Sequence, residues 1–473
     1  MKYISTRGNA PALDFQGATL AGLASDGGLY VPETWPTFTE AEIAAMAGLP
    51  YAELAARVMQ PFVGDCLTPE RLLELCRQAY GRFAHVAVTP LKQLDEKQWV
   101  LELFHGPTLA FKDVALQLLG LLFEEFLSRP KADGGDHHIT IVGATSGDTG
   151  SAAIDAVAGR AGVDIFMLHP HGRVSDVQRR QMTTVLAPNV YNIAIDGSFD
   201  DAQAMVKRMF NDAAMTGRFA ISAVNSINWA RLMAQVVYYF AAALQLGAPQ
   251  RKAAFSVPTG NFGDVFAGYV AAKMGLPIER LIVATNVNDI LHRALSSGDY
   301  SASTVTPTAA PSMDIQVSSN FERLLFDAAG RDGAALAAQM KGFEATKAMQ
   351  LTNAQRESIA ALFTSARADA NDMAHAMRWA HEATGEVLDP HTAIGLHGAR
   401  TAQGIPAGVP VVTLATAHPA KFRDAVERAT GVRPSLPTRM GDLFEREESC
   451  AHLPGDYDAV AAWIAERATP RHG

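Results

Sequence analysis

Short apolar runs that alternate with helical segments constrain the fold of this chain more than any other feature. Strands of a parallel sheet are buried on both faces and read as continuous apolar runs, and a crossover helix usually connects consecutive strands. The runs that we interpret as strands are 138–143, 163–168, 189–196, 253–257, 280–285 and 411–415. Helical spacing is found between or after them at 151–159, 200–210, 265–274 and 419–428. The alternation predicts an α/β fold with parallel sheets.

Two parts of the chain depart from this alternation. Residues 1–90 contain helical spacing at 40–47 and 69–80 but no series of apolar runs, so we expect a separate, mostly helical N-terminal domain. The Ala-rich segment 336–382 has helical spacing without a strand signal, and we expect a helical insertion or flank there. The length of 473 residues agrees with two or three domains.

Composition argues against several kinds of partner. The formal net charge of −9 at pH 7 gives the chain no attraction to the phosphate backbone of nucleic acids. The N-terminus lacks the apolar region of a signal peptide, and the longest apolar stretch, 236–247, is too short to span a bilayer. The spacing of Cys66, Cys76 and Cys450 fits neither a zinc site nor a disulfide framework. We expect a cytoplasmic protein with unpaired thiols, no metal site and no membrane or nucleic-acid partner.

Lys112 is the most unusual charged residue of the sequence. It follows the apolar residues Leu109, Ala110 and Phe111 and precedes an amphipathic helix. Desolvation and the positive end of a helix both disfavour the ammonium form, which helps the amine to act as a nucleophile. A lysine that forms a Schiff base needs this property. The alternative is a lysine whose aliphatic stem is buried while its ammonium group reaches solvent.

Two glycine-containing loops each join a predicted strand to a predicted helix. In the first, residues 143–150, the N–H groups of a helix start favour an anion, and the loop lacks the endings of a P-loop or a dinucleotide-binding fold. Its hydroxyl residues are Thr145, Ser146 and Thr149. In the second loop, Gly260 and Gly263 allow the backbone to approach a ligand closely. Each loop is also compatible with an ordinary strand-to-helix turn.

Two further polar positions complete the candidate site. Arg231 lies close in sequence to Asn225 at the start of a long apolar helix, and an arginine beside amides can make a forked contact to phosphate or carboxylate. Thr416 follows the predicted strand 411–415, and strand ends of parallel sheets face ligand crevices. A surface salt bridge and a helix cap are the alternatives for these two residues. Together with Lys112, the motifs indicate a ligand that has a phosphate, an aldehyde and a ring nitrogen.

Three strings of the sequence resemble the threonine synthase family of the bacterial and fungal type. They are Phe104-His-Gly-Pro-Thr-Leu-Ala-Phe-Lys-Asp, Met1-Lys-Tyr-Ile-Ser-Thr-Arg-Gly and Gly27-Gly-Leu-Tyr-Val-Pro. The resemblance covers nearly the whole chain and implies a fold-type-II pyridoxal-phosphate enzyme with two parallel-sheet lobes. It implies an N-terminal domain over residues 1–90 and a catalytic region over 91–473, whose smaller lobe is roughly 130–215 and whose larger lobe is the remainder.

The resemblance also assigns roles to individual residues. Lys112 would carry pyridoxal 5'-phosphate, Thr416 would bond its ring nitrogen, and Asp148, where many relatives have Asn, would face its ring oxygen. The residues that would hold the cofactor phosphate are Gly260, Asn261, Phe262, Gly263 and Asp264. The residues that would bind the substrate are Thr145, Ser146 and Thr149 at its carboxylate and Asn225 and Arg231 at its phosphate.

The reaction that the resemblance implies is the last step of threonine biosynthesis. Phosphate is eliminated from Cγ of O-phospho-L-homoserine and water adds at Cβ, while Lys112 moves the Cα proton. A phospho-lyase that stops after elimination, a dehydratase and a cysteine synthase are alternatives with the same fold. The Lys112 string and the N-terminal domain argue against the last two, and the missing P-loop ending argues against a nucleotide-binding protein. A non-catalytic relative is disfavoured by the complete set of motifs, and no recognisable interface indicates an oligomeric state.

Overall fold

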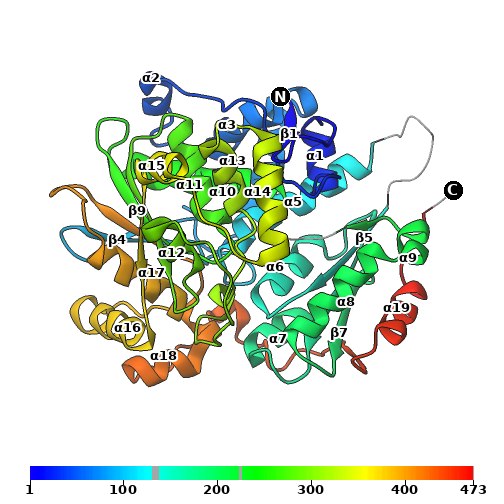
Figure 1. Ribbon diagram of the computed structural model, residues 1–473. Helices are drawn as coiled ribbons and strands as arrows, with labels where there is room; N and C mark the ends of the chain where they lie inside the picture. Colours follow the sequence, from blue (N-terminus) through cyan, green and yellow to red (C-terminus); the bar gives the residue numbers. More distant parts are fainter. Residues whose placement is uncertain (130–137, 223–225, 472–473) are drawn as a thin grey trace. The chain divides into compact units, whose positions relative to one another are not determined.

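The computed structural model describes residues 1–129, 138–222 and 226–471. Its chain divides into two compact units, which are described separately (Figure 1). The larger unit comprises Met1–Ala115 and Ser226–Pro434, and the smaller comprises Leu116–Asn225 and Ser435–Gly473. Both units contain parallel strands and helices, which confirms the predicted α/β class. The domain limits expected from the sequence remain a prediction.

The larger unit contains a six-stranded sheet in the order β11-β10-β9-β12-β4-β3. Its strands are β3 (Leu91–Gln93), β4 (Gln98–Glu102), β9 (Ala253–Pro258), β10 (Ile278–Thr285), β11 (Phe363–Arg367) and β12 (Val411–Ala415). All neighbours are parallel except β3 and β4. Helix α17 (Pro390–Thr401) packs closely on the sheet, because a Cβ at Gly395 would lie only 3.0 Å from Thr413 Cγ2. The parallel strands present their carboxyl ends at one edge, where ligand-binding loops gather.

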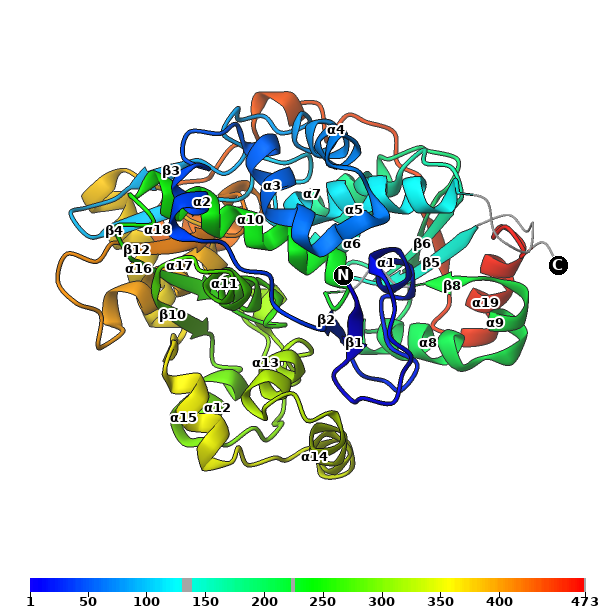
Figure 2. The same ribbon diagram turned by 90° about the horizontal axis from the view of Figure 1, so that it is seen from above.

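The N-terminal segment belongs to the same compact unit as this sheet. Strands β1 (Tyr3–Ser5) and β2 (Tyr30–Pro32) pair antiparallel and lie side by side in Figure 2. Helix α3 (Tyr51–Val63) contacts both α4 (Pro69–Tyr80) and α10 (Trp229–Gln245). The remaining helices of the unit are α1 (Phe15–Ala21), α2 (Glu40–Ala44), α11 (Gly263–Lys273), α12 (Ile290–Ser297), α13 (Phe321–Ala328), α14 (Gly333–Thr346), α15 (Asn353–Ala360), α16 (Ala370–Thr384) and α18 (Arg423–Thr430).

The smaller unit contains a five-stranded parallel sheet in the order β13-β7-β6-β5-β8. Its strands are β5 (Ile139–Ala144), β6 (Val163–Pro170), β7 (Val190–Ile195), β8 (Ile221–Ser222) and β13 (Ala451–Leu453). Its helices are α6 (Asp148–Val157), α7 (Asp176–Thr183), α8 (Phe199–Asn211), α9 (Ala213–Arg218) and α19 (Tyr457–Ala465), together with most of α5 (Lys112–Leu127), which begins in the larger unit. The C-terminal α19 shares one hydrophobic core with α8 and the sheet, and both views show it beside α8 and α9. The C-terminal segment from Ser435 thus packs on a unit formed mainly by Leu116–Asn225.

Three strands of the larger sheet, β3, β4 and β11, are absent from the strands expected from the sequence. We expected segment 336–382 to be helical without a strand, but β11 lies within it and pairs with β10. The error has a physical reason: β11 is a short strand at the sheet edge and buries only Phe363 and Ala366, so the run Phe-Thr-Ser-Ala-Arg lacks the continuous apolar residues of a strand that is buried on both faces. All six predicted strands are present, with shifts of one or two residues at their ends. Among the helices that the structure describes, none is long and apolar enough to cross a membrane.

Candidate active site

Lys112 begins helix α5 (Lys112–Leu127), and its side chain is buried, with only 7% of the residue exposed. The residues before it are bound to the segment that follows β12. The N–H of Phe111 donates to the carbonyl of Thr416 at 2.8 Å, and the N–H of His418 donates to the carbonyl of Leu109 at 3.0 Å. These contacts bring Lys112 and Thr416 together, as the sequence predicted only through a family resemblance.

Asp113 holds the loop that precedes Lys112. Its carboxylate accepts hydrogen bonds from the N–H and the hydroxyl of Thr108, at 2.8 and 2.6 Å. A Cβ at Gly106 would lie 2.4 Å from the Cβ of Asp113, so only glycine fits beside this carboxylate. Lys421 Nζ donates to the carbonyl of Thr108 at 2.9 Å. Sequence reasoning missed Lys421, which is more than 300 positions away and carries no local signal.

The second glycine-containing loop joins β9 to α11, as predicted. Phe262 adopts the left-handed conformation, with φ of 64°, which turns the chain into the helix. A Cβ at Gly260 would lie 2.6 Å from the carbonyl oxygen of Ser312, and a Cβ at Gly263 would lie 3.2 Å from Asn320 Nδ2. Within the described residues, the N–H groups from 260 to 263 have no protein acceptor. The loop therefore offers backbone donors at a helix start, where an anion is favoured.

Asp264 lies in the first turn of α11 and contacts two tyrosines of α10. The hydroxyl of Tyr238 donates to the Asp264 carboxylate, and the hydroxyl of Tyr239 donates to the Asp264 backbone carbonyl at 2.9 Å. Burial raises the pKa of Asp264 to about 7, although Tyr238, Arg231, Tyr239 and Lys112 all act to lower it. The sequence pointed to Asp264 as part of the loop but gave no sign of its tyrosine partners.

Arg231 lies near the start of α10 and is buried, with 4% of the residue exposed. Burial lowers its pKa to about 10, although Tyr238 and Asp264 act to raise it, so the guanidinium is protonated at pH 7. Its Nη1 is buried and has no hydrogen-bond partner among the described residues. The surface salt bridge considered from the sequence is therefore wrong for Arg231. A buried guanidinium with an unused N–H suits an anion.

The first glycine-containing loop belongs to the smaller unit. The hydroxyl oxygen of Thr145 accepts hydrogen bonds from the N–H groups of Gly147 and Gly150, both at 2.9 Å. Asp148 Oδ1 accepts a hydrogen bond from Gln178 Nε2 at 2.8 Å. Thr145 and Asp148 are buried, and the other two hydroxyl residues, Ser146 and Thr149, are half-buried. Thr145 thus holds the loop in shape, while its neighbours are accessible.

The structure brings together part of the predicted site within one unit. Lys112, Arg231, Thr416 and the loop 260–264 all lie in the larger unit, whereas Thr145–Thr149 lie in the smaller one. Asn225 falls outside the described residues. Within the described part of the chain, no group of three or more His, Cys, Asp or Glu side chains could hold a metal ion.

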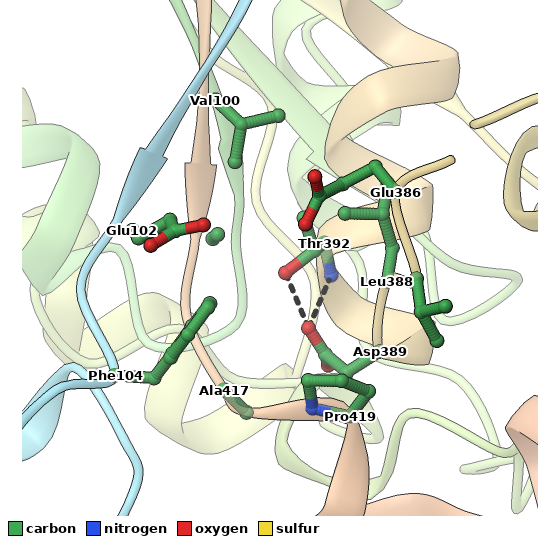
Figure 3. Close-up of a pocket in the computed structure, with 11 residues that line it drawn as sticks. Val100, Glu102, Phe104, Glu386, Leu388, Asp389, Thr392, Ala417 and Pro419 are labelled. Carbon is green, nitrogen blue, oxygen red and sulfur yellow. Dashed lines mark hydrogen bonds between the residues drawn. The ribbon is translucent and has the colours of Figure 1, made fainter. Parts of the chain in front are cut away.

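A small pocket adjoins Thr416 at the carboxyl ends of β4 and β12 (Figure 3). The residues that line it include Glu102, Glu386, Asp389, Ala415 and Ala417. Figure 3 shows the Asp389 carboxylate accepting hydrogen bonds from both the N–H and the hydroxyl of Thr392. The pocket has room for about one water molecule, so it is too small for an amino-acid substrate.

Three family models match consecutive parts of the chain. They describe the threonine synthase N terminus at residues 2–80, a pyridoxal-phosphate dependent enzyme at 82–370 and the threonine synthase C-terminal region at 392–464. A threonine synthase from Pseudomonas aeruginosa is 55% identical over 98% of this chain and 98% of its own. The chain belongs to the threonine synthase family. A rat protein named threonine synthase-like 2 is 38% identical over 96% of this chain and 94% of its own.

Solved structures of family members agree with this assignment. A pyridoxal-phosphate-bound threonine synthase from Brucella melitensis is 51% identical, with a TM-score of 0.95 over 99% of each chain. The threonine synthase of yeast is 39% identical, with a TM-score of 0.93 over 98% of each chain. The predicted family, fold and cofactor are confirmed: the protein is a pyridoxal-phosphate-dependent lyase of the threonine synthase family.

The residues of the larger unit fit pyridoxal phosphate. The loop 260–263 offers N–H donors without protein acceptors among the described residues, and its glycines lie where a Cβ would press on Ser312 or Asn320. Lys112 supplies a buried amine, and its loop is bound to Thr416 at a strand end. A phosphate, an aldehyde and a ring nitrogen therefore each have a candidate partner in this threonine synthase family member.

Proposed function

We propose that this enzyme converts O-phospho-L-homoserine and water into L-threonine and inorganic phosphate in the cytoplasm, as the last step of threonine biosynthesis. The observation that carries the proposal is the full-length match. The general model of a pyridoxal-phosphate enzyme covers 82–370, and models specific to threonine synthase match on both sides of it, at 2–80 and 392–464. An enzyme of the wider class needs only the central match, so the two flanking matches favour this particular reaction.

The larger unit would hold the cofactor at three points. Lys112 would bind its aldehyde carbon, the loop from Gly260 to Asp264 would hold its phosphate, and Thr416 would bond its ring nitrogen. When bound, pyridoxal phosphate supplies an electron sink that makes protons on carbons next to the reacting amine removable. Thr416 is a neutral partner and would not enforce a protonated ring nitrogen, whereas a carboxylate would. In the smaller unit, Asp148 would face the ring oxygen.

Lys112 would be both the attachment point and the proton carrier. Its Nζ would take the proton from the substrate Cα and would return a proton there at the end of the reaction. A tethered amine does this efficiently because it does not have to be collected from solution. The hydrogen bonds from the N–H of Phe111 to the Thr416 carbonyl and from the N–H of His418 to the Leu109 carbonyl keep the backbone before Lys112 in place.

Two groups would bind the substrate. Thr145, Ser146 and Thr149 would donate hydrogen bonds to its carboxylate. Arg231, together with Asn225, would bind its phosphate and stabilise the charge that develops when phosphate leaves Cγ. The unused Nη1 of Arg231 supports this role, because a buried N–H without a protein acceptor is ready to bind an anion.

The decisive experiment counts products. Purified enzyme loaded with pyridoxal phosphate is given O-phospho-L-homoserine, and phosphate, threonine and 2-oxobutyrate are measured over the same time course. The proposal predicts phosphate and threonine in equal amounts. Phosphate accompanied by 2-oxobutyrate would show an enzyme that stops after elimination, and the absence of both products would show that the substrate is a different amino-acid phosphate.

A further inference from the structure

The segment before helix α13 binds the carbonyl side of the loop 260–263. Ser318 Oγ donates to the carbonyl of Gly260 at 2.7 Å. The backbone N–H and the side-chain Nδ2 of Asn320 both donate to the carbonyl of Asn261, each at 3.0 Å. Ser318 and Asn320 are buried, with 2% and 0% of each residue exposed. Two consecutive carbonyl groups of the loop are thus held by one short segment.

These contacts fix the direction of the loop's N–H groups. In a trans peptide, the C=O and N–H bonds point in opposite directions. The carbonyl of Gly260 shares its peptide unit with the N–H of Asn261, and the carbonyl of Asn261 shares its unit with the N–H of Phe262. Both N–H groups therefore point away from Ser318 and Asn320. A hydrogen bond to the carbonyl also polarises the peptide and strengthens its N–H as a donor.

Arg323 sets the orientation of the Asn320 side chain. Arg323 Nη1 donates to Asn320 Oδ1, and arginine has no acceptor, so the amide oxygen must face Arg323. The amide nitrogen then faces the carbonyls of Asn261 and Ser226, at 3.0 Å from each. Because Arg323 is fully buried, its guanidinium has no alternative partner in solvent. The asparagine is therefore held as a donor to the loop.

The N-terminal segment in turn holds Arg323 and its neighbour Glu322. Arg323 donates to the carbonyl of Tyr30 at 3.1 and 2.9 Å through two nitrogens. Glu322 accepts from the hydroxyl of Thr6 at 2.7 Å and from Arg7 at 3.1 Å. These three partners lie within residues 2–80, the part that matches the threonine synthase N terminus. The first turn of α13 therefore connects that segment to the loop.

We propose that Ser318 and Asn320 are positioning residues for the cofactor phosphate, with Arg323 and the N-terminal segment holding Asn320 in its donor orientation. The proposal rests on the assignment of residues 260–263 as the phosphate loop. It gives the N-terminal segment a role in cofactor binding, although none of its residues is proposed to touch the cofactor.

The test compares four holoenzyme variants by the dissociation constant for pyridoxal phosphate and by the ³¹P NMR resonance of the bound phosphate. Ser318→Ala removes one carbonyl contact and should weaken binding about threefold to tenfold. Asn320→Asp keeps the shape but places an oxygen against two carbonyls, and should weaken binding about 10- to 100-fold. Arg323→Lys loses the forked contact and should shift the resonance in the same direction as Asn320→Asp. Ser256→Ala is the matched control, because Ser256 is fully buried and donates to the carbonyl of Gly395 at 2.6 Å.

The control separates positioning from general stability. Ser256→Ala should lower the melting temperature about as much as Ser318→Ala, while its phosphate resonance and dissociation constant stay at the wild-type values. The inference is overturned if Ser318→Ala keeps the wild-type dissociation constant and phosphate resonance, and if Asn320→Asp and Arg323→Lys, where they fold, keep both as well. Gly263→Val tests the loop itself, and unchanged cofactor binding by this variant would refute the loop assignment. If Gly263→Val weakens cofactor binding while Ser318→Ala binds as wild type does, only the positioning role is refuted.

Discussion

The ionisation of Asp264 should make the free energy of unfolding of the cofactor-free enzyme depend on pH, and Asp264→Asn should remove this dependence. Burial raises the pKa of this carboxyl from 3.8 to about 7. The folded protein therefore retains a proton between these two pH values that the unfolded chain has lost. Since the native state binds more protons there, the free energy of unfolding falls as pH rises from about 4 to 7.

The size of the effect follows from the shift. A difference of about three pKa units corresponds to about 4 kcal/mol, which is present below pH 4 and lost once pH exceeds 7. Asp264→Asn carries no proton to lose, and its oxygen still accepts the hydrogen bond from Tyr238. The variant pays a constant cost of about 1–3 kcal/mol because its buried amide N–H groups lack partners. Relative to wild type, it should thus gain about 4 kcal/mol between pH 4 and pH 8.

Urea unfolding of both cofactor-free proteins at several pH values measures this difference. Infrared spectroscopy provides a second reading, because a protonated buried carboxyl has its own C=O band, which Asp264→Asn lacks and which wild type should lose near pH 7. Asp212→Asn is a useful control, because hydrogen bonding lowers the pKa of that half-buried carboxyl. A stability difference between wild type and Asp264→Asn that stays constant from pH 4 to 8 would refute the reasoning.

Three further substitutions test the proposed roles of individual residues. Lys112→Ala should lower turnover by several orders of magnitude, since it removes the nucleophile and the proton carrier together. Borohydride reduction of the wild-type holoenzyme should attach the cofactor to Lys112, and a label on the exposed Lys273 would contradict the assignment. Gly263→Val should lose cofactor on dialysis, because a Cβ there already lies 3.2 Å from Asn320 Nδ2, and full occupancy would argue against the loop. Arg231→Ala should lower kcat/KM for O-phospho-L-homoserine by about 30- to 1000-fold and cofactor affinity much less, and Arg433→Ala, at an exposed arginine, is the control. Equal losses in kcat/KM and in cofactor affinity would assign Arg231 to the cofactor instead.

Part of the functional interpretation depended on local sequence alone. The string that ends in Lys112 and Asp113 and the two glycine-containing loops indicate a ligand with an aldehyde and a phosphate, because the nucleophile and the backbone donors of each loop are visible in a short stretch of chain. The six predicted strands were found for a similar reason: a strand buried on both faces needs a continuous apolar run, which is visible in the sequence. The resemblance to a known family then led from the motifs to a specific reaction, which the motifs alone did not indicate.

The tertiary structure decided what depends on contacts between distant segments. Strand β11 escaped notice because only two of its five residues are buried at the sheet edge, so it has no continuous apolar run. Lys421, Tyr238, Ser318 and Asn320 escaped notice because each has an ordinary local sequence, and its importance comes from a partner elsewhere in the chain. Periodicity and motifs report which residues are buried or adjacent. Which carboxyl a tyrosine meets, and which carbonyl an asparagine binds, is determined only when the sheet and its helices have packed.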